Sequence, residues 1–534
     1  MPAWSIRARP PGGSCSSTLQ RDPDVVRSVL EDAAHFPGGH APAVIAVASE
    51  ADVADAFHRQ RSVLAVGAQS SLTGGATPMG EVVLTTSRLN HIVEIGADSV
   101  RVQAGVTLAE LDAALRAAGR YYPPAPTFTG AFVGGTIATN AAGAATFKYG
   151  TTRDWVRAIT VVLPSGDVLD VERGQTQAHP DGYFEIDTSR GVAKIPVPGY
   201  RMPATAKLSA GYFAAPGMDL IDLFIGSEGT LGFITEATLR VVPVRPAICL
   251  ALVPFSSRDT AMSFVGRLRA TAQATWRGGD PNGIDVSAIE HMDRRCLELL
   301  RDDGVDRAMG AAVPADTVIA LLVTIELAAD TPAHDAYDQI GRARDADAAD
   351  GPLVRFCREL DAADVLDDVE IAVPGDRARA DQLLAVREGV PAAVNKRVGQ
   401  AKRDVDGRIE KTAADMIVPF EHLDAFMTAY ETAFRHRGLD AAVWGHISDG
   451  NLHPNVIPRS FADVEAGKAA IAALGAEAIR LGGAPLAEHG VGRSGIKQLL
   501  LEQLYGAEGI AEMRAVKRAI DPEWKLAPGV LFPR

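Results

Sequence analysis

Two histidines enclose a strong turn signal between residues 444 and 455. His446 and His453 flank the run Ser-Asp-Gly-Asn, whose residue types favour a tight turn. A strand–turn–strand would bring both imidazoles together, and imidazole is the commonest protein ligand for zinc and related divalent ions. The pattern predicts a metal site, with a pair of hydrogen-bonded core or surface histidines as the alternative.

A carboxylate beside a third histidine follows later in the chain, where Glu488 and His489 precede Gly-Val-Gly. A carboxylate often completes a site that two histidines begin. Two histidines and one acid leave coordination positions open for a substrate, as a catalytic metal requires. The residues His446, His453 and Glu488 therefore predict a catalytic divalent ion, zinc or manganese.

Three segments rich in glycine and other small residues lie beside strand-like runs, at 67–75, 130–143 and 226–232. Glycine lets a backbone approach a ligand closely, and successive free N–H groups form a concavity that binds anions. The first segment suits a diphosphate, and the second suits a large flat ligand resting on bare main chain. The first segment is neither a Walker loop nor the Gly-x-Gly-x-x-Gly fingerprint. One such segment could be an ordinary turn, but three are much harder to explain in that way.

Composition limits the class of protein. The 534 residues exceed the size at which one core stops growing, so we expect two or more domains. The net charge of -14 argues against a sequence-independent nucleic-acid binder. The four cysteines form no Cys-x-x-Cys, which argues against an iron–sulfur cluster or a disulfide framework. No apolar run reaches the ~18 residues that span a bilayer. We expect a cytoplasmic protein, with peripheral membrane association left open.

Local signals outline the elements that must position these residues. Capping patterns that begin at Ser49 and Thr107 predict two helices. The first 21 residues lack acids and an apolar core, and we expect a disordered tail rather than a transit peptide. The stretch 174–210 suggests an irregular insertion. Strands are expected at 82–86, 91–95, 100–104, 158–163, 168–171, 233–242, 249–253, 318–327 and 416–418, and further helices at about 257–273, 285–301, 332–347, 376–396 and 421–436. The second half thus predicts an antiparallel sheet with helices on one face.

The glycine segments carry a family resemblance. Val-Gly-Gly-x-x-Ala-Thr-Asn-Ala-Ala-Gly at 133–143 and Gly-Ser-Glu-Gly-Thr-Leu-Gly at 226–232 follow the loop at 67–75 in order. This order resembles the flavin domain of the vanillyl-alcohol oxidase/p-cresol methylhydroxylase superfamily. The resemblance implies FAD, held without a covalent bond because the first loop offers Gln69 and Ser70 where some members carry a flavin-linked histidine. The implied cofactor residues are Gly67, Ala68, Gln69, Ser70, Ser71, Gly74, Pro124, Gly134, Gly135, Thr136, Asn140, Gly143, Tyr149, Gly150, Glu228, Gly229, Gly232 and Ile234.

The second half resembles the FAD-linked D-2-hydroxy-acid dehydrogenases, among them D-lactate dehydrogenase, D-2-hydroxyglutarate dehydrogenase and the flavin subunit of glycolate oxidase. The resemblance rests on Gly-His-x-x-Asp-Gly-Asn-Leu-His at 445–453 and Glu-His-Gly-x-Gly at 488–492, with further matches at 288–293 and 521–529. It implies that His446, His453 and Glu488 bind the metal and that His489 is the general base.

The same resemblance implies residues that hold the substrate. Arg387 would clamp the substrate carboxylate, and Asn455 would neighbour the substrate. The family places a lysine two residues before an Asp-x-x-x-Pro run, but this sequence has Ala413 there. Lys411 is the nearest stand-in for that cation, and Lys402 is the next.

The implied protein has an α+β fold. Its expected parts are an N-terminal tail (1–38), a two-part FAD-binding domain of the p-cresol methylhydroxylase type (39–245), an α+β substrate domain with an antiparallel sheet (246–485), and a C-terminal segment that returns to the flavin site (486–534). It would oxidise a small D-2-hydroxy acid of the D-lactate type to the 2-oxo acid.

The partners are expected to be the small acid and an external electron acceptor, namely an electron-transfer flavoprotein, a quinone, a cytochrome or oxygen. No nucleic acid and no membrane span are expected, and a homodimer is among the open oligomeric states. Two alternatives remain: an alkylglycerone-phosphate-synthase-like flavoenzyme, and a flavoprotein subunit without catalysis.

Overall fold

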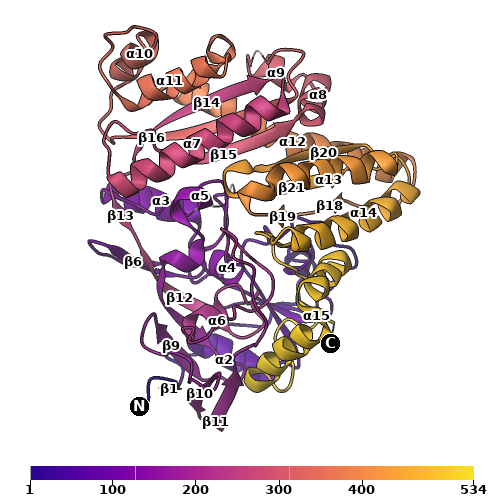
Figure 1. Cartoon of the computed structure of the whole chain (residues 1–534). Coiled ribbons are helices and arrows are strands. Elements are labelled where there is room, and N and C mark those ends of the chain that lie inside the picture. Colours follow the sequence, from indigo (N-terminus) through magenta and orange to yellow (C-terminus); the bar gives the residue numbers. More distant parts are fainter. Residues whose placement is uncertain (1, 125, 127, 312, 534) are drawn as a thin grey trace. The chain divides into compact units, whose positions relative to one another are not determined.

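The structure, a computed structural model, describes residues 2–124, 126, 128–311 and 313–533 (Figure 1). The chain divides into two compact units. Unit 1 comprises Met1–Gly143, Gly150–Val244 and Ala484–Arg534, and unit 2 comprises Ala144–Tyr149 and Arg245–Gly483. Among the described residues, no helix combines the length and the apolar character that a membrane crossing requires.

Unit 1 is built on a five-stranded antiparallel sheet and a three-stranded parallel sheet. The first has the spatial order β5 (Ile92–Ile95), β6 (Ser99–Gln103), β12 (Phe233–Arg240), β8 (Val156–Val162) and β9 (Val168–Glu172). The second has the order β2 (Val44–Ala46), β4 (Val82–Thr85) and β3 (Val63–Val66). These positions confirm the strands expected in this region and the α+β fold class.

Both expected helix starts in unit 1 are confirmed. In α2 (Glu50–Arg59) the Ser49 side chain accepts the N–H of Asp52. In α3 (Leu108–Ala117) Thr107 and Glu110 form a complete capping box. Helix α2 buries Val53 and Phe57 in one core with the strands of the parallel sheet. Local capping and apolar spacing are therefore sufficient to define these helices.

Two expectations for unit 1 were wrong, and a further segment is helical although its small residues are poor helix formers. That segment, residues 133–138, forms the short helix α4 (Val133–Ala138). The stretch 174–210 is not irregular throughout, because β10 (Tyr183–Thr188) and β11 (Gly191–Pro196) form an antiparallel hairpin there. The N-terminal tail is not disordered, since β1 (Ser5–Arg7) pairs in parallel with β10. Main-chain pairing with a distant strand, which local sequence cannot reveal, orders the tail.

Unit 2 contains an eight-stranded sheet whose pairs are all antiparallel. Its spatial order is β17 (Glu370–Ala372), β14 (Ala247–Phe255), β16 (Ile319–Leu327), β15 (Val286–Asp293), β20 (Ala441–His446), β21 (Asn451–Val456) and β18 (Thr412–Ala413), with β19 (Met416–Ile417) also paired to β21. The expected antiparallel sheet is confirmed. The helix expected at 285–301 was wrong in its first half, because β15 occupies that stretch between two partner strands and α8 (Arg294–Asp302) begins only after it.

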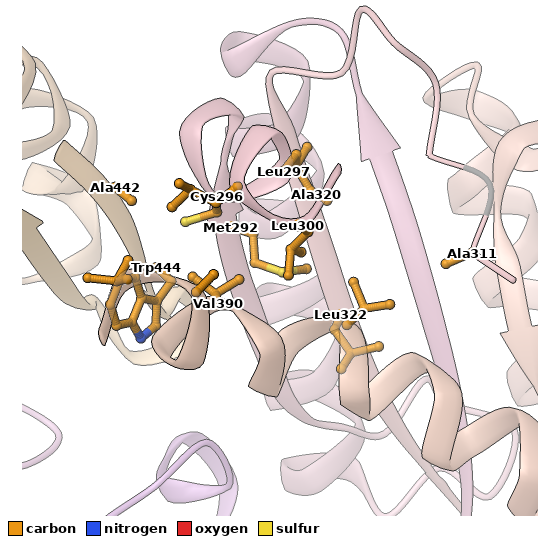
Figure 2. Packing of buried hydrophobic residues seen from close by; sticks show 14 of the residues in the cluster. Met292, Cys296, Leu297, Leu300, Ala311, Ala320, Leu322, Val390, Ala442 and Trp444 are labelled. Atoms are coloured by element: carbon orange, nitrogen blue, oxygen red, sulfur yellow. The ribbon is translucent and has the colours of Figure 1, made fainter. Parts of the chain in front are cut away.

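Helices cover both faces of this sheet, whereas the sequence analysis expected one covered face. Leu250 and Leu252 of β14 share a core with residues of α8 and α12 (Arg377–Asp404). Figure 2 shows this packing around Met292, Val390 and Trp444. The alternate residues of β14 point the opposite way, where the Phe255 ring lies 5.3 Å from the ring of Phe264 in α7 (Arg258–Gly278). Burial of both faces explains why β14 is apolar at nearly every position.

The C-terminal segment returns to unit 1 after Gly483. It contains the long helix α15 (Gly495–Ile520), yellow in Figure 1, for which the sequence analysis made no prediction. Beyond α15 the chain runs beside β3, where the Val63 N–H donates to the carbonyl of Lys525 and the Ala527 N–H donates to the carbonyl of Val63, both at 2.9 Å. The last residues thus complete the parallel sheet that precedes the first glycine segment.

Candidate cofactor and substrate sites

The three glycine segments meet within unit 1. The N–H of Gly226 donates to the carbonyl of Ile137 at 3.0 Å, and the N–H of Glu228 donates to the carbonyl of Ala138 at 2.7 Å. The first segment reaches the second at Gly67, where an added Cβ would lie 3.4 Å from the Cβ of Phe132. Segments far apart in the sequence therefore form one backbone surface, as a bound dinucleotide-sized ligand requires.

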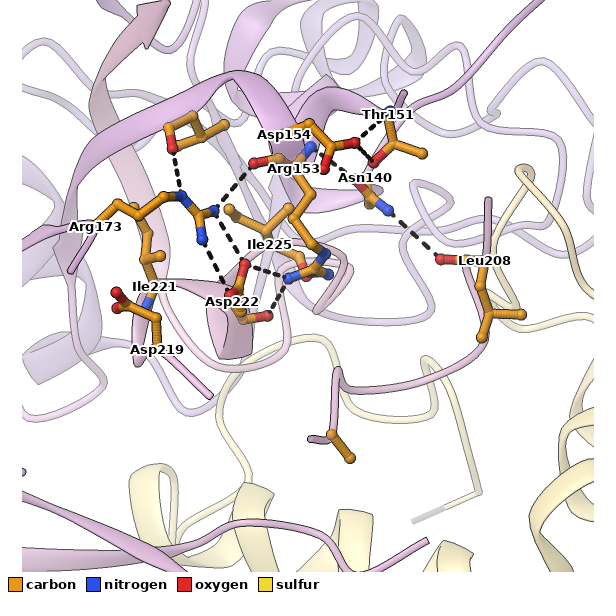
Figure 3. Close-up of polar contacts among 12 residues, drawn as sticks. Asn140, Thr151, Arg153, Asp154, Arg173, Leu208, Asp219, Ile221, Asp222 and Ile225 are labelled. Atoms are coloured by element: carbon orange, nitrogen blue, oxygen red, sulfur yellow. Dashed lines mark hydrogen bonds and ion pairs between the residues drawn. The ribbon is translucent and has the colours of Figure 1, made fainter. Parts of the chain in front are cut away.

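A buried ion-pair network fastens the second segment to the third (Figure 3). The guanidinium of Arg153 donates to the Asp222 carboxylate at 2.9 Å and to the carbonyl of Ile225 at 2.6 Å. The backbone N–H of Arg153 donates to Oδ1 of Asn140 at 3.0 Å. Asn140 has a φ of +48°, in the left-handed region that Asn tolerates better than most residues. Its predicted cofactor role therefore coincides with a structural one.

Two adjacent glycines of α4 have different surroundings. A Cβ on Gly134 would lie 2.6 Å from the Cβ of Ala104, so this glycine permits close packing inside the protein. A Cβ on Gly135 would meet no described atom within 4 Å. The Gly134 side of the helix thus packs against Ala104. The Gly135 side leaves an open cradle, a space that no described side chain enters. This arrangement fits the flat ring system of FAD.

The first loop is held by its own side chains. The amide of Gln69 donates to the carbonyls of Val29 and Ala76, at 2.9 and 2.8 Å. Gln69 and Gly74 both have positive φ, of +53° and +74°. The side chain of Gln69 therefore shapes the loop, and its predicted contribution to FAD binding comes from its main chain. The other predicted cofactor residues of unit 1 are Ala68, Ser70, Ser71, Pro124, Thr136, Gly143, Gly150, Gly229, Gly232 and Ile234.

Tyr149 is the predicted cofactor residue that belongs to unit 2. Its hydroxyl donates to the carboxylate of Glu326, and the neighbouring Lys148 ammonium lies 2.6 Å from both Glu326 and Asp285. The chain passes from unit 2 to unit 1 between Tyr149 and Gly150. A cofactor contact from Tyr149 stays a prediction.

The C-terminal segment is anchored beside the glycine segments. The Glu228 carboxylate accepts the N–H groups of Val491 and Gly492, at 2.7 and 2.8 Å. Burial raises the pKa of Glu228, and these two hydrogen bonds oppose that shift. The N–H of Arg493 donates to the carbonyl of Thr73 in the first loop at 2.9 Å. The motif that contains Glu488 and His489 is therefore fixed to the same backbone surface.

Lys207 is a residue that sequence reasoning missed. Its side chain is fully buried, and its ammonium donates to Oε2 of Glu488 at 2.8 Å. Nε2 of His489 lies 3.6 Å from Oε1 of the same carboxylate. Lys207 stands between Arg201 and Asp219 as a lone charge in a small and apolar stretch, and that isolation was the available signal. Within unit 1, Glu488 thus lies between a cation and the predicted base.

The two histidines of unit 2 lie on the predicted hairpin, which is confirmed. In the ladder of β20 and β21, Trp444 pairs with His453 and His446 pairs with Asn451. Directly paired residues share a face of the sheet. The two imidazole rings are 5.3 Å apart between centroids and nearly perpendicular. The structure therefore brings together His446 and His453 as the spacing predicted.

Each histidine has a buried carboxylate at Nδ1. Oε1 of Glu290 lies 3.0 Å from Nδ1 of His446, and Oδ1 of Asp415 lies 3.3 Å from Nδ1 of His453. The hydrogen bond between Glu290 and His446 fixes an imidazole tautomer in which Nε2 carries the lone pair that a metal needs. The donor set of unit 2 therefore fits a divalent ion. Sequence analysis assigned no role to Glu290 or Asp415, and for Glu290 an acid inside an apolar strand was the available signal.

Arg387 belongs to the same cluster. Its Nε donates to Oε2 of Glu290 at 3.0 Å, and both side chains are about one-eighth exposed, at 12%. Burial alone would raise the pKa of Glu290, but the charges of Arg387 and His446 lower it to about 2. The carboxylate is therefore ionised across the physiological range, and it holds the predicted clamp next to a predicted metal ligand.

Family models match both halves of the chain. The FAD binding domain matches residues 41–172, and the C-terminal domain of FAD linked oxidases matches residues 246–531. The chain belongs to the FAD-linked oxidase family. FAD is accordingly its cofactor, and the chain is an oxidoreductase.

Curated relatives of this FAD-linked oxidase carry related names. A D-2-hydroxyglutarate dehydrogenase of Xanthomonas citri pv. viticola is 31% identical over 481 residues, which cover 88% of this chain and 84% of the relative. A D-lactate dehydrogenase of Anaerostipes hadrus is 27% identical, with 87% and 82% covered. The glycolate oxidase subunit GlcD of Bacillus subtilis is also 27% identical, with 88% and 83% covered.

A solved alkyldihydroxyacetonephosphate synthase resembles this FAD-linked oxidase with a TM-score of 0.61 and 15% identity. The alignment covers 97% of this chain and 82% of that one. At this identity the likeness concerns the fold alone.

The lysine expected near the substrate has no counterpart at its usual position in this FAD-linked oxidase. Ala413 of β18 pairs with Asn455 of β21, and Lys411 is an exposed residue just before β18. Lys402 is exposed near the end of α12. Asn455 is buried, its Nδ2 donates to the His453 carbonyl at 2.9 Å, and its Oδ1 has no hydrogen-bond partner among the described residues. A substrate role for Lys411 stays a prediction.

Proposed function

We propose that this FAD-linked oxidase converts a small D-2-hydroxy acid of the D-lactate type to the 2-oxo acid. The observation that carries the proposal is the cluster in unit 2, where Glu290 holds both the Arg387 guanidinium and the His446 imidazole. A carboxylate clamp beside a metal-binding imidazole suits a substrate that carries a carboxylate and a hydroxyl on neighbouring carbons. The names of three relatives agree with this substrate class.

When bound, FAD supplies the redox chemistry by accepting hydride from Cα, and a divalent ion stabilises negative charge on the substrate oxygen. The chain's own residues would bind and orient the acid. Arg387 donates two hydrogen bonds to the carboxylate and thereby fixes which face of Cα is presented. Its Nε–H is used by Glu290, so the outer edge with Nη1 and Nη2 remains for this fork.

His489 would take the hydroxyl proton, since an imidazole accepts a proton near neutral pH. Glu488 would complete the set of metal ligands that His446 and His453 begin. Both residues belong to unit 1, whereas His446 and His453 belong to unit 2. The electrons would then pass to an external acceptor, such as an electron-transfer flavoprotein, a quinone, a cytochrome or oxygen.

A panel of acids assayed with an artificial dye acceptor tests the reaction. We expect D-lactate, D-2-hydroxyglutarate or glycolate to reduce the dye. L-Lactate and L-2-hydroxyglutarate should react at least about 100-fold more slowly than their D forms, because the clamp fixes one face of Cα. Failure of every 2-hydroxy acid with flavin-loaded protein would exclude the proposed function and favour an ether-forming or non-catalytic role.

Substitution of one histidine tests the metal. His446→Ala should lower kcat at least about 1,000-fold, because the charge on the substrate oxygen loses its stabilisation. The flavin absorbance should be unchanged, since the glycine segments lie in unit 1. Metal analysis of active wild-type protein should give one divalent ion per chain, and active protein without such an ion would contradict the metal role.

A further inference from the structure

Glu290 contacts two groups that the proposed reaction uses for different purposes. Its Oε1 lies 3.0 Å from Nδ1 of His446, and its Oε2 accepts from Nε of Arg387 at 3.0 Å. The three side chains come from β15, β20 and α12. Register explains the first contact, because Glu290 and His446 are direct partners in the ladder and share a face of the sheet.

We propose that Glu290 is a positioning residue that fixes the Nδ1–H tautomer of His446 and the orientation of Arg387 at the same time. With the proton held on Nδ1, the lone pair of His446 lies on Nε2. With Nε held by Oε2, the guanidinium presents its Nη1–Nη2 edge. One carboxylate thereby sets the distance between a metal ligand and the carboxylate clamp. What these two groups do rests on the proposed function, but the tautomer is a property of unit 2 alone.

A carboxylate is required because both partners donate. The substitution Glu290→Gln leaves one accepting oxygen and introduces one donating NH2 group. If the oxygen accepts from Arg387, the NH2 faces Nδ1 of His446, which must become an acceptor and carry its proton on Nε2 instead. If the amide is turned round, the introduced NH2 group opposes the Nε–H of Arg387 and the guanidinium is displaced. Either arrangement loses one of the two functions.

Asp415 offers an internal comparison. Its Oδ1 lies 3.3 Å from Nδ1 of His453 and also accepts from Nδ2 of Asn451 at 2.9 Å. It thus lies at ion-pair distance from a histidine and hydrogen-bonds the first residue of β21, whereas Glu290 hydrogen-bonds both a histidine and the predicted clamp. Loss of Glu290 should therefore affect both metal binding and substrate binding, and loss of Asp415 should affect metal binding alone.

Histidine tautomers in the full-length, flavin-loaded and metal-stripped protein test the proposal. Long-range proton–nitrogen spectra of 15N-histidine-labelled protein at about pH 8 distinguish Nδ1–H from Nε2–H imidazole. The His446 signals are identified by their loss in His446→Gln. We expect Nδ1–H in the wild type. In Glu290→Gln we expect Nε2–H if the amide oxygen keeps Arg387, and Nδ1–H with a displaced guanidinium if the amide is turned round.

Two further readouts separate positioning from general destabilisation. If the variant carries Nε2–H on His446, Zn2+ titration of the same protein should show affinity about 10- to 100-fold weaker than in the wild type. If the variant keeps Nδ1–H, steady-state kinetics at saturating Zn2+ should show KM raised more than kcat is lowered, because the clamp is misplaced. The matched control is Glu370→Gln, which alters another Glu–Arg pair between the sheet and α12, where Glu370 bonds Arg379. It should change neither the His446 tautomer nor the Zn2+ affinity.

Each outcome decides the proposal. An Nε2–H signal for His446 in the wild type overturns it, even if Glu290→Gln fails to fold. Unchanged tautomer, Zn2+ affinity and KM in folded Glu290→Gln also overturn it. If the wild type binds no Zn2+ but the tautomer still changes in Glu290→Gln, the positioning role stands and the metal of the proposed function fails.

Discussion

In unit 1 the surface assigned to FAD is main chain, with glycines that pack edge-on against Ala104 or face a clear cradle. In unit 2 the candidate substrate site consists of side chains, in which Glu290 hydrogen-bonds His446 and the Asp415 carboxylate lies 3.3 Å from His453. FAD binding in the first region depends on the absence of side-chain atoms beside the main chain. The arrangement of the second region depends on the pairing of buried charged groups. Added volume should therefore disrupt the first region, and changed charge should disrupt the second.

Lys207 is the strongest test of this contrast, because it places a buried ion pair in unit 1. Lys207→Met should destabilise the protein by about 3–5 kcal/mol, since the Glu488 carboxylate loses its buried cation. Urea unfolding measures the change, and Lys207→Arg serves as the control that keeps the charge. The double variant Lys207→Met/Glu488→Gln should recover part of the loss. A Lys207→Met protein as stable as the wild type would show that the buried Glu488 carboxylate does not need the Lys207 cation.

His291 departs from the pattern of the candidate substrate site in unit 2, in which buried charged groups are paired. Neither of its buried ring nitrogens has a hydrogen-bond partner among the described residues. Burial lowers its pKa from 6.5 to about 4. Between these values the unfolded chain binds the proton more tightly, so the unfolding free energy falls as pH decreases from 6.5 to 4, by about 3 kcal/mol. His291→Phe should remove this component and leave stability at neutral pH nearly unchanged. Identical acid profiles of the two proteins in urea unfolding would refute the prediction.

The glycine pair of α4 should give the smallest change in stability and the clearest separation of fold from cofactor. Gly134→Val should cost about 1–3 kcal/mol, because its Cβ would lie 2.6 Å from that of Ala104. Gly135→Leu should keep the wild-type melting temperature but lose FAD, because its side chain would enter the cradle. Thermal unfolding and the flavin absorbance together measure both effects. Full FAD occupancy in Gly135→Leu would show that FAD does not bind in the open space beside Gly135.

The parts of the fold that could be predicted from sequence have local causes. The capping box at Thr107 and Glu110 and the hairpin around Gly450 are specified within a few residues. The glycine segments could be recognised because a backbone that approaches a ligand closely requires glycine and other small residues, and these are visible in the sequence. By contrast, β15 was taken for the start of a helix, because its strand identity depends on partner strands elsewhere in the chain.

The same division holds for the candidate site. His446 and His453 carry a residue type whose chemistry is evident without partners, whereas the role of Arg387 was implied only by the family resemblance. Glu290 acquires its role from Arg387, 97 residues away, and Lys207 from Glu488, 281 residues away. A lone acid in a strand or a lone lysine in a small-residue stretch is uninformative until the fold supplies its partner.

The chain crosses between the units four times, after Gly143, Tyr149, Val244 and Gly483. During synthesis, β3 therefore emerges from the ribosome long before residues 525–527, which pair with it. Unit 2 is complete once Gly483 has emerged, whereas unit 1 must wait for residues 525–527. A nascent chain of this enzyme would thus finish unit 2 before the parallel sheet of unit 1 is complete.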